Sequence, residues 1–258
     1  MRSLRLFSIL LCLSIFIIIT IPIQFLLNIF KLKFKHTYPL FFYKVIKTIA
    51  GINIDTEGFE KIRKKGTGTL YVANHVSWFD ILCLGSILNA RFIAKKEVAS
   101  MGIFGFLAKL SNTFFIDNSN KNKIYQYNNF IREKLINGES LILFPEGTTS
   151  DGNSIRKFKS SLFECINSIE SLIHVQPISI CYARKNNIPM GIYSRRFIAW
   201  IGEISMVSSM KEFLSSGSIT VNLIFHPKIS INQFNNRKEL SSFCEEQILI
   251  GLNKTIKI

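Results

Sequence analysis

The sequence predicts an α/β domain with a central, largely buried mixed sheet flanked by helices, preceded by an N-terminal hydrophobic membrane helix. Three observations support this fold class. Short apolar runs alternate with longer helical patterns, an uncharged apolar stretch lies near the N-terminus, and polar motifs directly follow two of the apolar runs. Such alternation is typical of domains whose helices cover a central sheet.

The first element is the stretch from Leu6 to Phe30, which contains no charged residue. It exceeds the roughly 20 residues that a helix needs to cross a bilayer. It lacks the short apolar region and cleavage site of a signal peptide, so we expect it to stay in the membrane. Pro22 would kink or divide the helix, so a segment that dips into one leaflet is the alternative to a true span. We therefore divide the chain into an anchor, 1–35, and one domain, 36–258.

The charges beside this stretch predict its orientation. Basic residues on its two sides are Arg2 and Arg5 before it, and Lys31, Lys33, Lys35, Lys44 and Lys47 after it. By the positive-inside rule, we expect the domain to face the cytoplasm. The five cysteines form no C-x-x-C pair, which indicates reduced core residues rather than disulfides or metal ligands.

The net charge of +15 indicates an anionic partner. No zinc-finger spacing, aromatic RNA-binding strand or basic zipper is present, so we expect no nucleic-acid partner. Behind a hydrophobic anchor, the charge favours an anionic membrane surface, with about 1 kcal/mol for each well-placed Lys or Arg. Most single lysines are nevertheless expected to be solvated surface residues.

The remaining elements alternate along the domain. Strand candidates are TLYVA (69–73), RFIAK (91–95), TFFID (113–117), SLILF (140–144), HVQPISI (174–180), RFIAWIG (196–202) and ITVNLIFH (219–226). Helix candidates lie near 79–88, 96–110, 121–137, 157–170, 209–215 and 237–253. Ligands bind at the carboxyl ends of strands in such sheets, and two polar motifs follow strand candidates there.

The first motif is NHVSWFD (74–80). If a helix begins near Ser77, the chain folds back enough for His75 and Asp80 to meet. The carboxylate would then fix the imidazole tautomer, so that the other ring nitrogen could remove a proton from a hydroxyl. The same spacing also fits a capping box, in which Ser77 caps the helix and Asp80 returns the bond, and spacing alone favours this cap. A nucleophilic Ser77 is a weaker alternative, because the glycines of a G-x-S-x-G turn are missing.

The second motif is FPEGTTSDG (144–152). Pro-Glu-Gly predicts a tight turn, and backbone N–H groups with the following hydroxyls could hold an anion or the polar head of an acceptor. Beyond it, Arg156, Lys157 and Lys159 precede a helix candidate, where a phosphate could bind. Such clusters are more often ordinary surface charge.

Taken in order, these residues resemble the lysophospholipid acyltransferase family, which includes 1-acylglycerol-3-phosphate acyltransferases. Its N-H-x-S-x-x-D motif is matched by residues 74–80, and its F-P-E-G-T-R-S motif resembles FPEGTTS. A block of the type G-x-x-A-K-L-G-x-x-F-I-D-R resembles GFLAKLSNTFFIDN (105–118), and later family segments resemble KFKSSLF and VQPIS. The resemblance runs from about Leu70 to about Ile180.

The resemblance implies an acyltransferase-type domain and a role for each motif. His75 would be the general base, and Asp80 would orient it. Substrate-binding residues would be Asn74, Glu146, Gly147, Thr148, Lys157 and Lys159. The acyl donor would be a thioester of coenzyme A or acyl carrier protein, and no metal or other cofactor is implied.

The acceptor that the resemblance implies first is lysophosphatidic acid, which would be converted to phosphatidic acid in phospholipid biosynthesis. Asn118 and Thr149 stand where the family usually has arginines that could grip a phosphate. Lys121, Lys123, Lys157 or Lys159 could supply charge instead. The motifs are also similar to a branch that acylates lyso-ornithine lipid, so another lysolipid is the alternative. A non-catalytic, membrane-tethered protein that binds lipid or nucleic acid is the third hypothesis.

Overall fold

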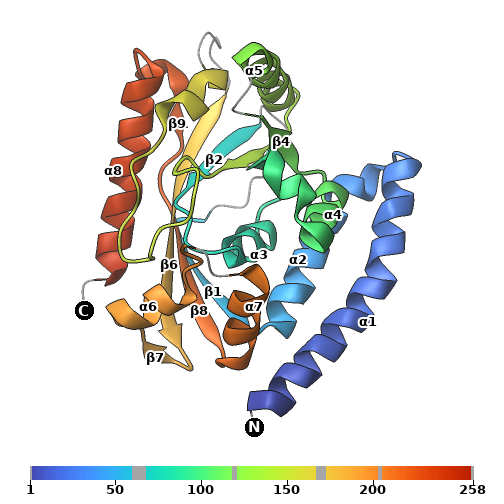
Figure 1. Cartoon of the computed structure of the whole chain (residues 1–258). Helices are drawn as coiled ribbons and strands as arrows, with labels where there is room; N and C mark the ends of the chain where they lie inside the picture. Colours follow the sequence, from blue (N-terminus) through green and yellow to red (C-terminus); the bar gives the residue numbers. More distant parts are fainter. Residues whose placement is uncertain (1, 60–67, 118–120, 167–172, 203–204, 257–258) are drawn as a thin grey trace.

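The computed structural model describes residues 2–59, 68–117, 121–166, 173–202 and 205–256, and it has a central sheet with helices on both faces (Figure 1). The strands are β1 (Ile52–Glu57), β2 (Thr69–Ala73), β3 (Arg91–Lys95), β4 (Phe114–Ile116), β5 (Leu141–Leu143), β6 (His174–Lys185), β7 (Ile188–Pro189), β8 (Ile219–Phe225) and β9 (Ile229–Ser230). The α-helices are α1 (Arg2–Ile29), α2 (Tyr38–Ile49), α3 (Phe79–Gly85), α4 (Gly102–Leu110), α5 (Lys121–Ile136), α6 (Ile192–Ile198), α7 (Met206–Ser215) and α8 (Arg237–Ile256). The 3-10 turns are η1 (Lys33–His36), η2 (Lys96–Ser100), η3 (Ser160–Ile166) and η4 (Ile231–Gln233). The predicted fold class is confirmed.

The sheet is mixed, as predicted. Its strand order is β1-β8-β6-β2-β5-β3-β4, with β7 and β9 paired to β6. β2 lies between β5 and β6 and is parallel to both, whereas β8 is antiparallel to β6 and parallel to β1. The central position of β2 matters for function, because the first polar motif begins where this strand ends.

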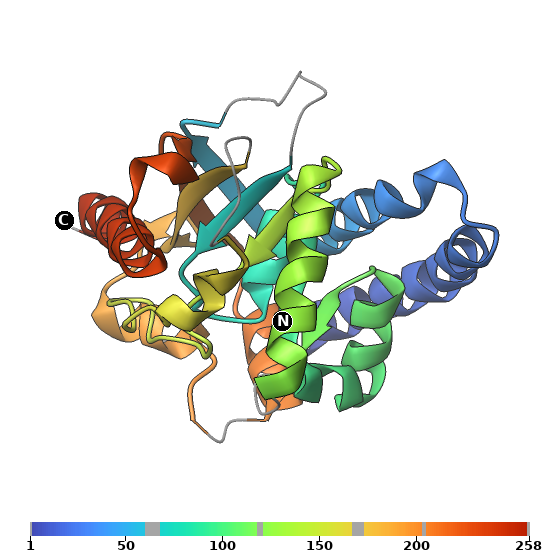
Figure 2. The same ribbon diagram turned by 90° about the horizontal axis from the view of Figure 1, so that it is seen from above.

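Every residue of β2 is buried, because helices cover both faces of the sheet (Figure 2). Successive side chains of a strand point to opposite faces. Leu70 and Val72 accordingly join a core cluster that includes residues of α5 and α8. Tyr71 and Ala73 join a cluster that includes residues of α2, α3 and α7. This double coverage explains why the strand reads as a continuous apolar run.

One strand prediction is wrong. RFIAWIG (196–202) contains the end of α6 and the non-helical residues that follow it, rather than a strand. The buried residues Arg195 and Ile198 have helical spacing, which the apolar alternation concealed. The segment 196–202 pairs with none of the described strands. Its backbone instead bonds the first polar motif, with the Trp200 amide donating to the Val76 carbonyl at 3.0 Å.

The helix predictions are confirmed with shifted limits. The candidate at 96–110 is divided into η2 and α4, because Met101 leaves helical geometry and Gly102 has a φ of 52°. In the candidate at 157–170, residues 157–159 are not helical, η3 covers Ser160–Ile166, and the rest lies outside the described residues. The candidates from the sequence did not include α2 or β1. β1 lies at the edge of the sheet, and its alternation includes charged residues.

Helix α1 continues through Pro22 and lies along the domain beside α2, α4 and α7 (Figure 1). Polar side chains fasten both of its ends. Arg5 Nε donates to the Leu214 carbonyl at 3.3 Å, and Asn28 Nδ2 donates to the Leu110 carbonyl at 2.9 Å. The helix is long and apolar enough to cross a membrane, and most of its apolar side chains are exposed. This exposed apolar surface supports membrane association.

Helix α8 packs closely on the sheet at Gly251. A Cβ atom there would lie 2.3 Å from Ser179 Oγ and 2.8 Å from His226 Nε2. These two side chains are buried and hydrogen-bonded to each other at 2.8 Å. The absence of a side chain at position 251 therefore allows the helix to approach the strands.

We predict that Gly251→Ala lowers the free energy of unfolding by about 1–3 kcal/mol, because the added methyl group overpacks a filled core. A lower melting temperature of the purified protein in detergent would report this. Gly191→Ala is the matched control, because nothing lies within 4 Å of its added Cβ atom. Equal melting temperatures of the two variants would contradict the proposed close packing.

Candidate active site

Two polar loops meet at the carboxyl ends of neighbouring parallel strands. Residues 74–78 follow β2, and the turn at 144–147 follows β5, which pairs directly with β2. The amide of His75 donates to Oε1 of Glu146 at 2.7 Å, which joins the loops. The two motifs therefore lie together at the sheet edge where the sequence predicts a ligand site.

His75 and Asp80 are in direct contact. Nδ1 of the imidazole lies 2.8 Å from Oδ2 of the carboxylate. The histidine side chain is 18% exposed, whereas the aspartate is fully buried. Because an ionised carboxylate only accepts hydrogen bonds, Nδ1 donates and Nε2 keeps a free lone pair. The ring also stacks on Phe144, with the centroids 4.2 Å apart. The imidazole is therefore held in one orientation and is partly exposed.

The predicted helix cap forms with different partners. The helix begins at Phe79, and the hydroxyl of Ser77 has no hydrogen-bond partner within the described part of the chain, so its predicted capping role is wrong. Oδ2 of Asp80 instead accepts from the amides of Val76 and Ser77 at 2.7 and 3.0 Å. The same carboxylate thus caps the helix start and contacts the imidazole. A helix cap and a contact with the histidine are therefore compatible roles for Asp80.

Asn74 lies inside the protein rather than at the surface of the site. Its Nδ2 donates to the Ile180 carbonyl at 3.0 Å, and its Oδ1 accepts from the Ile180 amide at 2.7 Å. Its side chain is fully buried. The amide therefore continues the pairing of β2 with β6 past the last strand residue. Asn74 is therefore placed to fix the loop, whereas the sequence led us to expect a contact with the substrate.

Glu146 is also buried, and its carboxylate connects two segments. Oε1 accepts from the His75 amide and Oε2 accepts from the Arg156 amide, each at 2.7 Å. Burial raises the pKa of this carboxyl to about 7, although the two backbone donors oppose the rise. The side chain therefore fixes the backbone of His75, and in this arrangement both of its oxygens already accept hydrogen bonds from the protein.

The residues after Glu146 face different ways. Gly147 has a φ of 70°, and a Cβ there would lie 2.9 Å from Lys159 Nζ. Thr148 is exposed, whereas Thr149 is buried and its hydroxyl donates to the Trp200 carbonyl. Position 149, where the resembling family has arginine, thus points into a protein contact.

Three cationic side chains were predicted beyond the turn, and two of them are connected to it. Arg156 Nε donates to the Thr149 carbonyl at 3.0 Å, and the end of the Lys159 side chain lies beside Gly147. Lys157 is exposed. Asn118 and the side chains of Lys121 and Lys123 lie outside the described residues. Positive charge therefore borders the site without an arginine at position 149.

Two residues that bond the NHVSWFD motif were not predicted from the sequence. The amide and hydroxyl of Ser150 donate to the His75 carbonyl at 2.7 and 3.1 Å. The hydroxyl of Tyr182 on β6 donates to Oδ1 of Asp80 at 2.8 Å. The Tyr182 contact spans 102 residues of sequence, and no local spacing indicates it.

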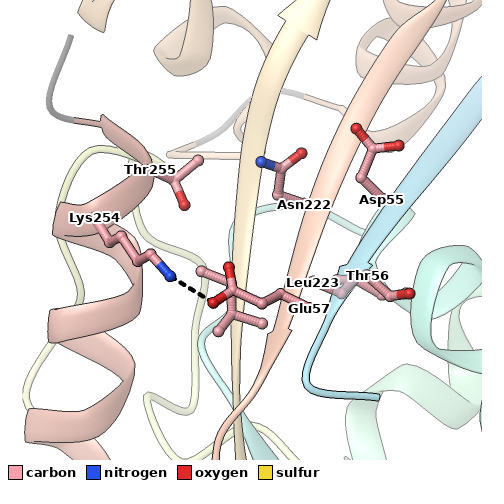
Figure 3. Close-up of a pocket in the computed structure, with 8 residues that line it drawn as sticks. Asp55, Thr56, Glu57, Asn222, Leu223, Lys254 and Thr255 are labelled. Atoms are coloured by element: carbon pink, nitrogen blue, oxygen red, sulfur yellow. Dashed lines mark hydrogen bonds and ion pairs between the residues drawn. The ribbon is translucent and has the colours of Figure 1, made fainter. Parts of the chain in front are cut away.

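A pocket of about 420 Å³ lies elsewhere, between α8 and strands β1 and β8 (Figure 3). Its lining includes an ion pair between Glu57 and Lys254, both more than half exposed. None of the predicted site residues lines this pocket. The motif residues converge instead at the carboxyl ends of β2 and β5, near His75.

The chain is similar to known acyltransferases. The family model described as "Acyltransferase" matches residues 53–181. The chain is 35% identical to a lyso-ornithine lipid O-acyltransferase of Rhizobium meliloti, covering 90% of this chain and 80% of the relative. The protein of that name from Brucella abortus is 33% identical, covering 88% and 86%. A 1-acyl-sn-glycerol-3-phosphate acyltransferase of Neisseria meningitidis is 31% identical over 52% of each chain.

The fold has a solved counterpart. The crystal structure of the 1-acyl-sn-glycerophosphate (LPA) acyltransferase PlsC from Thermotoga maritima superposes with a TM-score of 0.69, covering 100% of this chain and 99% of that one. The two sequences are 23% identical. At this level of identity, the similarity shows the fold alone.

The raised pKa of Glu146 gives a pH-dependent prediction. The folded protein holds this proton more tightly than the unfolded chain, whose carboxyl has the model value of 4.5. The contribution of this group to stability is therefore present below about pH 4.5 and declines as the pH rises to about 7, by up to about 3 kcal/mol. In Glu146→Gln, the free energy of unfolding measured from pH 4.5 to 8 should lack this decline.

The same variant should lower enzyme activity at least about 10-fold, because an amide nitrogen would face one backbone N–H group and displace the His75 loop. The control is Glu57→Gln, which changes an exposed carboxylate far from the motifs. Identical pH profiles of stability for wild type and Glu146→Gln would contradict the burial of an ionisable group here.

Proposed function

The chain belongs to the acyltransferase family, and we propose that it transfers a fatty acyl group from an acyl thioester to the free hydroxyl of a lysolipid, with His75 as the general base. The observation that carries the proposal is the contact between Nδ1 of His75 and the buried Asp80, which leaves Nε2 free at an accessible ring. Relatives named for lysolipid acylation support the substrate class.

In the proposed reaction, Nε2 of His75 takes the proton of the lysolipid hydroxyl as its oxygen attacks the thioester carbonyl. The tetrahedral intermediate then expels the thiolate, which recovers the proton from the imidazolium. The products are the new ester and a free thiol, and the histidine returns to its starting form. Asp80 keeps the imidazole in the required tautomer throughout and stabilises its transient positive charge.

The donor that we propose is a thioester of coenzyme A or of acyl carrier protein. It serves as a co-substrate, and the proton transfers just described require no metal or other cofactor.

Two acceptors fit the cationic border of the site. Lysophosphatidic acid would present a phosphate to Arg156 and Lys159, and relatives bearing the corresponding name support it. Lyso-ornithine lipid would present a carboxylate, and relatives with that name align over a larger share of the chain. The buried Thr149 also favours an acceptor that does not need an arginine there.

We further propose that α1 holds the enzyme at the membrane, where the lysolipid acceptor and the acylated product reside. Because α1 is fastened to the domain at both ends, its exposed apolar side fits lengthwise burial in one leaflet. The basic residues after α1 favour a domain on the cytoplasmic side, next to anionic headgroups.

A direct assay tests the proposed reaction. Membranes carrying the protein, supplied with labelled acyl-CoA or acyl-ACP, should form a diacylated product with lysophosphatidic acid or with lyso-ornithine lipid. His75→Ala should lower the rate by about 10²–10⁴-fold, because the attacking hydroxyl loses its base. His174→Ala, which changes an exposed histidine at the start of β6, is the matched control and should retain the wild-type rate.

The acceptor that yields product identifies the substrate. Release of free fatty acid without an acylated lipid would replace the transferase by a hydrolase. A fully active His75→Ala would instead remove the histidine from the mechanism.

The position of α1 gives a second test. Ile18→Lys places a charge on the exposed side of this helix, where the residue is 71% exposed. A charge at the centre of an apolar helix costs about 2.5–3.5 kcal/mol, so binding to vesicles should weaken on the order of 100-fold. Ile188→Lys, at a residue 69% exposed on β7, is the control and should bind like wild type. Equal loss in both variants would argue against α1 as the specific membrane element.

A further inference from the structure

We propose that Tyr182 on β6 is a positioning residue for the catalytic pair, acting through Asp80 on His75. This inference rests on the proposed acyl transfer and adds a residue outside the sequence motifs. The central observation is the hydrogen bond of 2.8 Å from the Tyr182 hydroxyl to Oδ1 of Asp80.

The two oxygens of Asp80 have different partners. Oδ2 accepts from His75 Nδ1 and from the amides of Val76 and Ser77, all within 3.0 Å. Oδ1 accepts from Tyr182. With donors on both oxygens, the carboxylate cannot rotate without breaking bonds in a fully buried environment. The phenol therefore fixes the plane of the carboxylate, and the carboxylate fixes the direction in which the imidazole points.

The tyrosine is suited to donate rather than to ionise. Burial and the neighbouring carboxylate raise its pKa well above the ordinary value, so the hydroxyl keeps its proton at neutral pH. The ring is 1% exposed and belongs to the core cluster that also contains Phe79 of α3. Its hydroxyl is thus the polar end of an otherwise apolar side chain and is directed at Asp80.

The backbone of β6 is irregular at this residue. Its pairing with β8 shifts register between Tyr182 and Arg184, and the Ala183 carbonyl accepts from the Met190 amide at 2.8 Å. Bulges often occur next to active sites, where they redirect a side chain. Two residues earlier, Ile180 pairs with the Asn74 side chain. β6 therefore contacts both the first residue of the motif, Asn74, and its last residue, Asp80.

Tyr182→Phe removes only the hydroxyl. We expect kcat for acyl transfer to fall about 10–100-fold, because a hydrogen bond to a buried charge is lost. The KM for the acceptor should change less than about threefold, because the phenol is buried away from the substrate. Tyr71→Phe is the matched control, since Tyr71 is a buried tyrosine on the adjacent strand β2 and makes no hydrogen bond to Asp80. It should keep the wild-type kcat.

A double-mutant cycle separates positioning from general stability. In an Asp80→Ala background, adding Tyr182→Phe should lower kcat less than about twofold further, because its effect passes through the missing carboxylate. An undiminished additional loss would overturn the proposal, as would a wild-type kcat in Tyr182→Phe. If wild type transferred no acyl group at all, the proposed function would fail first, and the role of Tyr182 with it.

Discussion

The buried carboxylate of Asp80 is the constraint on which the site depends. An ionised group in a protein core is strongly unfavourable unless donors surround it. Its donors come from the His75 ring, from the backbone that follows β2 and from Tyr182 on β6. Each donor must hold its place for the charge to remain buried. The cost of burying one carboxylate therefore links a loop, the start of α3 and a central strand into one arrangement.

A second buried carboxylate completes this arrangement from the other side of the loop. Glu146 accepts from the amide of His75, and Ser150 donates to the carbonyl of the same residue. The backbone of His75 is thus held on both its polar groups, while Asp80 holds its side chain. An imidazole fixed in this way would need little reorganisation in taking a proton from a hydroxyl, and such preorganisation is where enzymes gain much of their rate. These contacts exist because β2 and β5 are adjacent and parallel.

The sequence predicted the parts of this site that local pattern encodes. Alternating apolar runs revealed the sheet, and the ordered motifs placed His75, Asp80 and Glu146 at the carboxyl ends of its parallel strands. Partners distant in sequence were beyond reach: Tyr182 lies 102 residues from Asp80, and Asn74 bonds a residue 106 positions away. Their identification requires the order and register of the strands. The error at 196–202 has a similar origin, because the turn of α6 and the bond from the Trp200 amide to the Val76 carbonyl are set by contacts distant in sequence.

The pairing of Glu146 also bears on how the acceptor is held. Its second oxygen accepts from the Arg156 amide, and the amide of Lys159 donates to the carbonyl of Pro145 in the same turn. The segment that carries Arg156 and Lys159 is therefore bonded to the same turn that bonds the backbone of His75. A lysolipid headgroup bound by these cations would lie at a defined separation from His75, so its hydroxyl would arrive at a constant position. At position 149 the hydroxyl bonds the Trp200 carbonyl instead, so the cationic side chains that border this turn are those of Arg156 and Lys159.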